Sequence, residues 1–287
     1  MTRLRSVASI KSKLAIVAML LVFIALLFTL IAGSGFWGGI SLMTRGFGGG
    51  DGTPEHPYIV VSRAGFAYMA REAEAGNSFS GKHFKLADDV DMGGETVPIG
   101  RLGKPFNGLF DGNGKTVSNI AINLPNNGGV GLFGSIGREG RVADLNIREA
   151  DISGGWNVGG VAGYNGGSLV NVSIVGKVSG VLDNTGGLAG LNGGVIRDCR
   201  ANVAVEGESA VGGLAGSNNG EIAACVATAA ACLGEDNAGG IAGMNAGTIS
   251  DSLASGYVEG VIRAGGIAGL NRGTVGNSAA SGAVSGI

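Results

Sequence analysis

From about residue 129 onward, hydrophobic and polar positions recur at a fixed spacing along the chain. Each copy contains the run Gly-Gly-(Leu/Ile/Val)-Ala-Gly-x-Asn-x-Gly, in which small residues flank one aliphatic position. The steps between copies are 27, 26, 27 and 26 residues, and a degenerate copy lies upstream at residues 131–137. A repeat of this length predicts a solenoid, in which each unit buries its apolar face against the next. The copies begin at Gly159, Gly186, Gly212, Gly239 and Gly265.

Alignment of the copies places aliphatic residues in columns. The segment from Cys199 to Val205 alternates with a period of two, which is typical of a β-strand. Parallel strands stack equivalent residues about 4.8 Å apart, so like side chains would pack on one another. β-Branched columns and abundant glycine disfavour helical repeats. The sequence therefore predicts an all-β parallel β-helix with about three short strands per coil. Four columns are Val161, Leu188, Leu214, Ile241 and Ile267; Ala162, Ala189, Ala215, Ala242 and Ala268; Leu169, Ile196, Ile222, Ile249 and Val275; and Val178, Val205, Ala231, Val258 and Val284.

Each copy also carries one asparagine and a glycine two residues later. We interpret the asparagines as turn residues whose side-chain amides bond the backbone and the asparagines of neighbouring coils. A ligand-binding role is the alternative. We expect the glycines to adopt a positive φ at the same bend. The asparagines are Asn165, Asn192, Asn218, Asn245 and Asn271, and the glycines are Gly167, Gly194, Gly220, Gly247 and Gly273.

The N-terminal 53 residues predict a membrane anchor and a linker. Residues 1–13 are basic, and residues 14–32 form an uncharged apolar run long enough to cross a bilayer as a helix. The positive-inside rule places residues 1–13 in the cytoplasm and the body outside the cell. A cleaved signal peptide is the alternative, because small residues follow the apolar run. Residues 33–53 are rich in glycine and serine and predict a flexible linker.

Residues 54–128 lack the regular repeat and predict an N-terminal cap with the first coils. Residues 57–61 and 115–122 have strand patterns, and a further strand begins at His83. Between them, Phe66, Met69, Ala70 and Ala73 recur at helical spacing after Ser62, which predicts a helix over residues 62–75. A solenoid needs such a cap because its first coil would otherwise expose its core and its unpaired backbone groups.

The run Gly-Gly-Leu-Ala-Gly-x-Asn-x-Gly-x-Ile-x-x-Cys resembles the GLUG repeat of bacterial surface and secreted proteins. Residues 52–58, 79–91 and 106–114 resemble the segments that precede those repeats, so the resemblance extends over about residues 52–287. It implies a right-handed parallel β-helix displayed outside the cell, as in adhesins or stalks. It identifies an architecture and carries little information on activity.

Composition and charge narrow the choice of partner. Glycine accounts for 58 of the 287 residues, and only 15% of the residues are charged. All 22 acidic residues but only 15 of the 20 basic ones lie beyond residue 48, which leaves an acidic body. Phosphate binding needs a basic surface, so nucleic acid is not an expected partner.

The cysteines and histidines, which are candidates for a reactive or metal-binding site, can be explained by structural roles. Cys199 and Cys225 share a column one coil apart, at a separation that permits a disulfide. Buried unpaired cysteines are the alternative, and both remain open. The chain has no paired-cysteine motif and only two histidines, His56 and His83, so no metal or other cofactor is expected.

Acidic side chains form two sets. Asp88, Asp89 and Asp91 are interpreted as a solvated turn. A second set follows the last strand of successive coils and would keep one edge of the solenoid hydrated, with weak cation binding as the alternative. This set is Asp183, Glu206, Glu208, Glu235, Asp236 and Glu259.

These observations favour a non-catalytic extracellular surface protein for adhesion or interaction, either membrane-anchored or secreted. Repeated weak contacts with a protein or glycan would raise avidity. The alternatives are a polysaccharide-degrading β-helix enzyme and a truncated structural stalk. The last coil, residues 278–287, is expected to expose a strand edge and to promote self-association. Candidate contact positions, which vary between coils, are Tyr164, Leu191, Met244, Leu270 and Arg272.

Overall fold

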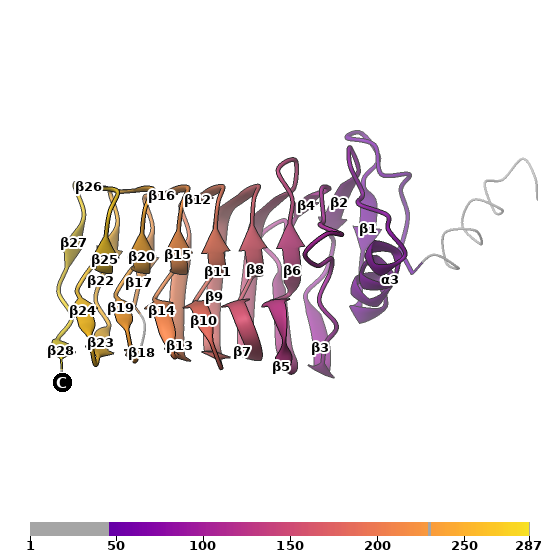
Figure 1. Cartoon of the computed structure of the whole chain (residues 1–287). Coiled ribbons are helices and arrows are strands. Elements are labelled where there is room, and N and C mark those ends of the chain that lie inside the picture. Colours follow the sequence, from indigo (N-terminus) through magenta and orange to yellow (C-terminus); the bar gives the residue numbers. More distant parts are fainter. Residues whose placement is uncertain (1–45, 229–230, 287) are drawn as a thin grey trace, which may run out of the picture. The chain divides into compact units, whose positions relative to one another are not determined.

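The computed structural model describes residues 46–228 and 231–286, which form a parallel β-solenoid of the right-handed type (Figure 1). One helix in this part of the chain, α3 (Arg63–Glu74), lies at the N-terminal end of the solenoid. The predicted all-β parallel fold is therefore confirmed. The expected membrane-spanning segment, residues 14–32, lies outside the described residues. Within the described ranges, no helix is both long enough and apolar enough to cross a bilayer.

Helix α3 has the boundaries and the buried face that its sequence predicts. It follows Ser62 at the N-cap position, although the Ser62 hydroxyl makes no capping hydrogen bond. Phe66 and Met69 are fully buried, and the Phe66 ring lies 5.7 Å from that of Phe110 in the first coils. At the C-terminal end of α3, Glu74 accepts a hydrogen bond of 2.7 Å from Nε of Arg101. Hydrophobic and charged contacts thus hold the cap on the solenoid.

The ordered cap begins within the expected linker. Phe47 belongs to residues 33–53, yet its side chain is 3% exposed. Its ring stacks on Tyr58 at 4.9 Å and meets Phe84 edge-on at 5.7 Å. The Gly48 amide donates to the Ile59 carbonyl, which joins this segment to the first strand. Residues 46–53 are therefore part of the cap, because aromatic contacts with later residues fix them in place.

The strands before the regular coils are few and uneven in length. They are β1 (Tyr58–Val60), β2 (His83–Leu86), β3 (Val90–Glu95), β4 (Leu109–Asp111), β5 (Thr116–Val130) and β6 (Phe133–Ile136).

The coils that follow share one order of strands, and the longest strands come first. They comprise β7 (Arg141–Gly159), β8 (Ala162–Asn165), β9 (Ser168–Gly180), β10 (Asp183–Gly186), β11 (Ala189–Asn192), β12 (Val195–Arg197), β13 (Arg200–Gly207), β14 (Ser209–Gly212), β15 (Ala215–Asn218), β16 (Glu221–Ala223), β17 (Val226–Ala227), β18 (Ala231–Gly234), β19 (Asn237–Gly239), β20 (Ala242–Asn245), β21 (Thr248–Ser250), β22 (Leu253–Ala254), β23 (Tyr257–Gly260), β24 (Arg263–Gly265), β25 (Ala268–Asn271), β26 (Thr274–Gly276), β27 (Ala279–Ala280) and β28 (Val284–Gly286).

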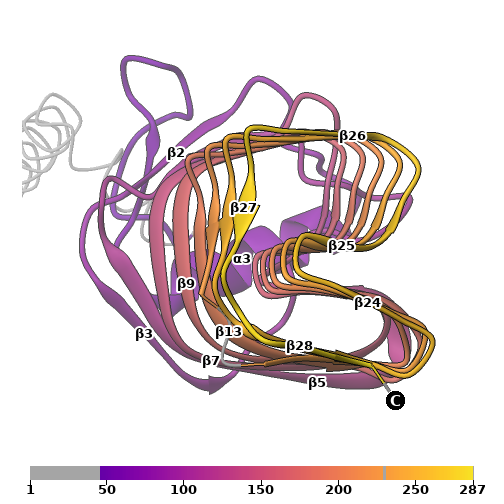
Figure 2. The ribbon, with the colours of Figure 1, turned by 90° about the vertical axis from the view of Figure 1, so that its left-hand side faces the viewer.

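The strands form two parallel sheets. Most belong to a 22-stranded sheet, whereas β6, β8, β11, β15, β20 and β25 form a six-stranded sheet of their own. Viewed along the solenoid, the ribbon turns inward at β25 between β24 and β26 (Figure 2). The six-stranded sheet therefore occupies the inner bend of the coils from β6 to β25.

The predicted columns are present, with one correction of register. The alanine and the Leu169–Val275 columns pair as expected along their whole length. In the last column, however, Val205 pairs with Cys232 and Cys232 pairs with Val258. Ala231 pairs instead with Ala204. The coil between Val205 and Cys232 is one residue longer than the sequence alignment assumed, so the buried column contains a cysteine.

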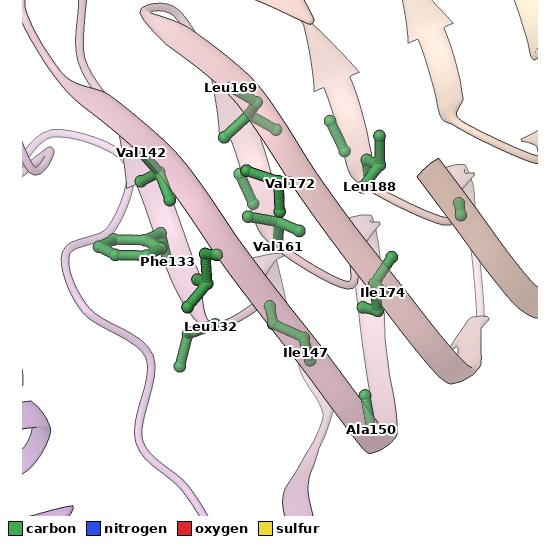
Figure 3. Packing of buried hydrophobic residues seen from close by; sticks show 14 of the residues in the cluster. Leu132, Phe133, Val142, Ile147, Ala150, Val161, Leu169, Val172, Ile174 and Leu188 are labelled. Carbon is green, nitrogen blue, oxygen red and sulfur yellow. The ribbon is translucent and has the colours of Figure 1, made fainter. Parts of the chain in front are cut away.

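The core changes in character along the axis. In the first coils, Phe84, Phe106 and Phe133 form a chain of rings with centroids 5.8 and 5.1 Å apart. Later coils fill the interior with stacked aliphatic residues, among them the fully buried Val161 and Leu188 (Figure 3). Each such residue is shielded by its equivalent in the next coil, so a thin interior can remain dry.

The regular spacing of glycines reflects close backbone approach. A Cβ atom on Gly194 would lie 2.1 Å from the Gly167 carbonyl oxygen, and one on Gly247 would lie 2.0 Å from that of Gly220. None of the five bend glycines, residues 167, 194, 220, 247 and 273, adopts a positive φ. The expected left-handed conformation was therefore wrong. Glycine is needed because the backbone of the preceding coil leaves no space for a side chain.

Candidate functional site

The five asparagines form a buried amide ladder along the six-stranded sheet, defined here as Asn165, Asn192, Asn218, Asn245 and Asn271. In each step, Nδ2 donates a 2.8 Å hydrogen bond to Oδ1 of the asparagine in the next coil. Four members are at most 1% exposed, and only Asn271 reaches the surface. Such burial leaves no room for a ligand, so the ladder stabilises the stacking of the coils.

The amide ladder has a direction and a defined start. Asn165 pairs with Ile136 of the preceding coil, and isoleucine has no side-chain amide that could donate a hydrogen bond. The Oδ1 atom of Asn165 consequently has no hydrogen-bond partner among the described residues. A second buried polar atom without such a partner, Oγ1 of Thr185, lies in a column between Val158 and Val211.

A parallel ladder uses thiols and then hydroxyls. We call Cys199, Cys225, Ser252 and Ser278 the thiol–hydroxyl ladder. The backbone amide of Cys199 donates to Sγ of Cys225 at 3.4 Å, and that of Cys225 donates to Oγ of Ser252 at 3.1 Å. Each side chain in turn donates to the carbonyl two residues earlier. The thiols are free and buried, and they serve here as hydrogen-bonding groups.

Two of the three thiols, those of Cys199 and Cys232, have low reactivity. A hydrogen bond with Cys225, together with burial, raises the pKa of Cys199. Burial raises the pKa of Cys232 to about 12. Nucleophilic or metal-binding cysteines need the thiolate form, which is not accessible to these two residues near neutral pH.

The acidic sets have mainly structural contacts. Asp89 accepts a 2.8 Å hydrogen bond from the Thr116 amide, and Asp91 accepts one of 2.8 Å from the Gly93 amide. In the second set, Glu206 and Glu259 flank Leu233 in one column and line a shallow hollow of about 220 Å³. Among the described residues, no group of three or more acidic, histidine or cysteine side chains could hold a metal ion.

Four of the five predicted contact residues lie in one register column. Along β8, β11, β15, β20 and β25, the pairing brings Tyr164, Leu191, Met244 and Leu270 into line. They are partly exposed, whereas their strand neighbours in the amide ladder are buried until the last coil, so the column faces outward. The sequence reasoning missed Ser217, which fills the middle position, and Arg272 lies two residues beyond Leu270. The outer column is defined as Tyr164, Leu191, Ser217, Met244 and Leu270.

A separate charged pocket lies on the outer face of the 22-stranded sheet, near the cap. It has a volume of about 410 Å³ and spans β2, β4 and β7, with the loop at residues 54–57 along its rim. Register places Leu109 between His83 and Arg141 in one column, and Asp111 between Lys85 and Ala143 in another. Its ionisable lining residues are Glu55, His83, Lys85, Asp111, Arg141 and Asp144.

Little in the sequence indicates this pocket. The dipeptide Asp111-Gly112 is typical of a tight turn, and Asp144 belongs to no motif. Asp111 pairs with Ala143, 32 positions later, a spacing unlike that of the regular repeats. The two carboxylates on adjacent coils therefore escape a search for periodic acids, although the strand pattern around each residue could have brought them together.

Comparisons with known proteins show partial similarity to two curated proteins. No family model matches the chain. Halomucin of Haloquadratum walsbyi is 35% identical over 141 residues, which cover 46% of this chain and 2% of halomucin. A protein of Evansella cellulosilytica, provisionally named a Gly-rich membrane protein, is 32% identical over 45% of this chain and 15% of its own length. The chain thus spans a small part of these curated relatives.

One solved structure has a similar fold. It belongs to a Bacteroides ovatus protein provisionally assigned as an immunoglobulin A1 protease, with a TM-score of 0.63 and 22% sequence identity. The similarity covers 80% of this chain and 76% of that one. At this identity, the comparison establishes a shared fold alone.

Proposed function

We propose that the chain is a non-catalytic surface module that binds a protein or glycan partner through its outer column. The observation that carries this proposal is the alignment of Tyr164, Leu191, Met244 and Leu270, all partly exposed, on one line of the six-stranded sheet that is interrupted by the buried Ser217. Aromatic and methionine side chains are common at binding surfaces because they provide large, adaptable contact areas. Arg272 adds a cation next to the last member of the column.

Repetition of the outer column from coil to coil would determine how the chain binds its partner. Equivalent residues in successive strands lie about 4.8 Å apart, so an extended partner would meet one side chain per coil. Each contact would be weak, and the sum would depend on several coils binding at once. Variation in side-chain type along the column would provide a specific pattern for one partner, whereas the constant glycines and asparagines provide the scaffold.

A location at the cell surface agrees with the names of the relatives, one a mucin and the other a membrane protein. Residues 14–32 would anchor the chain, with the solenoid outside the cell. Cleavage after this segment would instead release the solenoid as a secreted protein.

The test is a binding screen against extracellular matrix proteins and glycans with the full chain. Once a partner is found, Tyr164→Ser and Leu191→Ser together should weaken binding by about tenfold or more, since each removes apolar contact area. Val175→Ser is the matched control, because Val175 is 45% exposed but lies in β9 of the other sheet. Equal effects of the two changes, or no bound partner, would refute the proposal.

An enzyme acting on polysaccharides is the second candidate. The observation in its favour is the charged pocket, where Asp111 and Asp144 approach from adjacent coils. Two carboxylates are the usual requirement for cleavage of a glycosidic bond. Incubation with uronate-containing polysaccharides, with and without calcium, should release no product if the chain is only a binding module.

We also propose that the last described coil mediates self-association. Val275 and Val284 are 37% and 45% exposed there, and no further strand pairs with β25 or β28 among the described residues. Open strand edges attract other strands. Sedimentation velocity should show dimers whose fraction rises with concentration, and Val275→Lys with Val284→Lys should remove them. A concentration-independent monomer would contradict this.

A further inference from the structure

The charged pocket has the size and the lining of a small-molecule site. Its volume of about 410 Å³ falls within the range of about 300–1,000 Å³ that ligand pockets usually have. Three strands from successive coils form its floor, and the loop at residues 54–57 forms its rim. Strands hold side chains more rigidly than loops, so the charges at the floor are fixed in position.

The charges of the pocket are held apart. Among the described residues, no ion pair within 4.0 Å involves any of the six ionisable side chains of the pocket. Lys85 and Arg141 therefore keep their donors free. Arg197 lies in the same register column as Lys85, four coils away, and it pairs with Glu221.

The two aspartates are oriented by other groups. Oδ1 of Asp111 accepts a 2.7 Å hydrogen bond from the Asn113 amide, and Oδ1 of Asp144 accepts one of 2.6 Å from Nδ2 of Asn171. Each carboxylate has further lone pairs available. Among the described residues, these carboxylates belong to no group of three or more potential metal ligands. They are placed to accept hydrogen bonds from a ligand larger than an ion.

We propose that the charged pocket binds an acidic saccharide of the uronic acid class. A carboxylate of the sugar would meet Arg141 and Lys85, because guanidinium and ammonium groups are the natural partners of carboxylates. Asp111 and Asp144 would accept hydrogen bonds from sugar hydroxyl groups. Leu109, which is partly exposed between these charges, offers a surface for the C–H face of the ring. This site is distinct from the outer column, which lies on the other sheet.

The test is calorimetric titration of the detergent-solubilised full chain with trigalacturonate. The neutral trisaccharide maltotriose serves as the comparison ligand. We expect binding of the acidic trisaccharide, weakened by added salt because charges contribute to it. Arg141→Gln and Lys85→Gln should each weaken binding by about tenfold. Arg197→Gln is the matched control, an exposed cation on the same face outside the pocket, and should change the affinity less than twofold.

Several results would overturn the assignment. Absence of trigalacturonate binding, equal affinity for maltotriose, or equal losses in Arg141→Gln and Arg197→Gln would each do so. The far-UV circular dichroism of each variant should match that of the parent, because Arg141 is exposed and makes no described ion pair. Tyr164→Ser should leave trigalacturonate binding unchanged, so failure of this site and failure of the outer column can be distinguished.

Discussion

Replacement of Asn218 by alanine tests whether the amide ladder holds the coils together. Asn218 lies in the middle of the ladder and is fully buried. Its Nδ2 donates to Oδ1 of Asn245 at 2.8 Å and to the Thr248 carbonyl at 3.2 Å. Its Oδ1 accepts from Nδ2 of Asn192 at 2.8 Å. Alanine would remove these three hydrogen bonds and a longer one, of 3.4 Å, from Nδ2 to the Gly220 carbonyl.

The expected loss follows from these contacts. Oδ1 of Asn245 has no other donor among the described residues, and a buried polar group left without a partner costs about 1–3 kcal/mol. Nδ2 of Asn192 would retain the Glu221 carbonyl at 3.2 Å, so its loss is smaller. With a further contribution of about 1 kcal/mol from the small cavity, we expect destabilisation by about 3–5 kcal/mol.

Urea unfolding of residues 46–287, followed by far-UV circular dichroism, would measure the change in the free energy of unfolding. Asn271→Ala is the matched control at the exposed end of the same ladder. Nδ2 of Asn245 would keep the Thr274 carbonyl at 3.3 Å and could reach water. The free energy of unfolding of this control should fall by less than about 1 kcal/mol. If Asn218→Ala lost no more than the control, the ladder would not be a major source of stability.

Three further changes test other contacts. Thr185→Val should raise the free energy of unfolding by about 1–2 kcal/mol, since it removes a buried hydroxyl without a described partner; a lower urea midpoint would contradict this. Gly247→Ala should destabilise by about 3 kcal/mol or more because its Cβ would lie 2.0 Å from a carbonyl oxygen, whereas Gly276→Ala, with open space around it, should cost under about 1 kcal/mol in the same assay. Hydrogen bonds from Arg101 and then Lys104 lower the pKa of Glu74 to about 2, so its stabilising contribution is present above the ordinary value of 4.5 and is lost as the pH falls toward 2. Thermal unfolding across this pH range should therefore show a smaller decline for Glu74→Gln than for the parent, and parallel curves would refute the role of this contact.

The sequence predicted the solenoid because stacking in register places like residues together. The alanine column, for example, is visible in the sequence because its members recur once per coil, and the same recurrence pairs them in space. The pattern is weaker where a coil gains a residue, as between Val205 and Cys232. The added residue moves the buried position of this strand from Ala231 to Cys232. Both residues are small and apolar, so the sequence does not indicate which of them is buried.

Features that depend on contacts between distant segments could not be predicted in this way. Phe47 stood in a glycine-rich stretch, and its burial depends on rings far along the chain, such as Phe84. The bend glycines were recognised as necessary, but the sequence does not distinguish a positive φ from a lack of space for Cβ. The charged pocket arises in the irregular first coils, where Asp111 and Asp144 carry no periodic signal.

The equivalence of successive coils has a consequence for how such a gene changes. Because each coil offers the next one the same backbone edges, amides and alanines, duplication or deletion of a 26- or 27-residue unit would leave every remaining junction intact. The molecule could lengthen or shorten in increments of about 4.8 Å without redesign of its interior. Recombination between repeats would thus adjust how far the solenoid extends while the terminal cap remains the same.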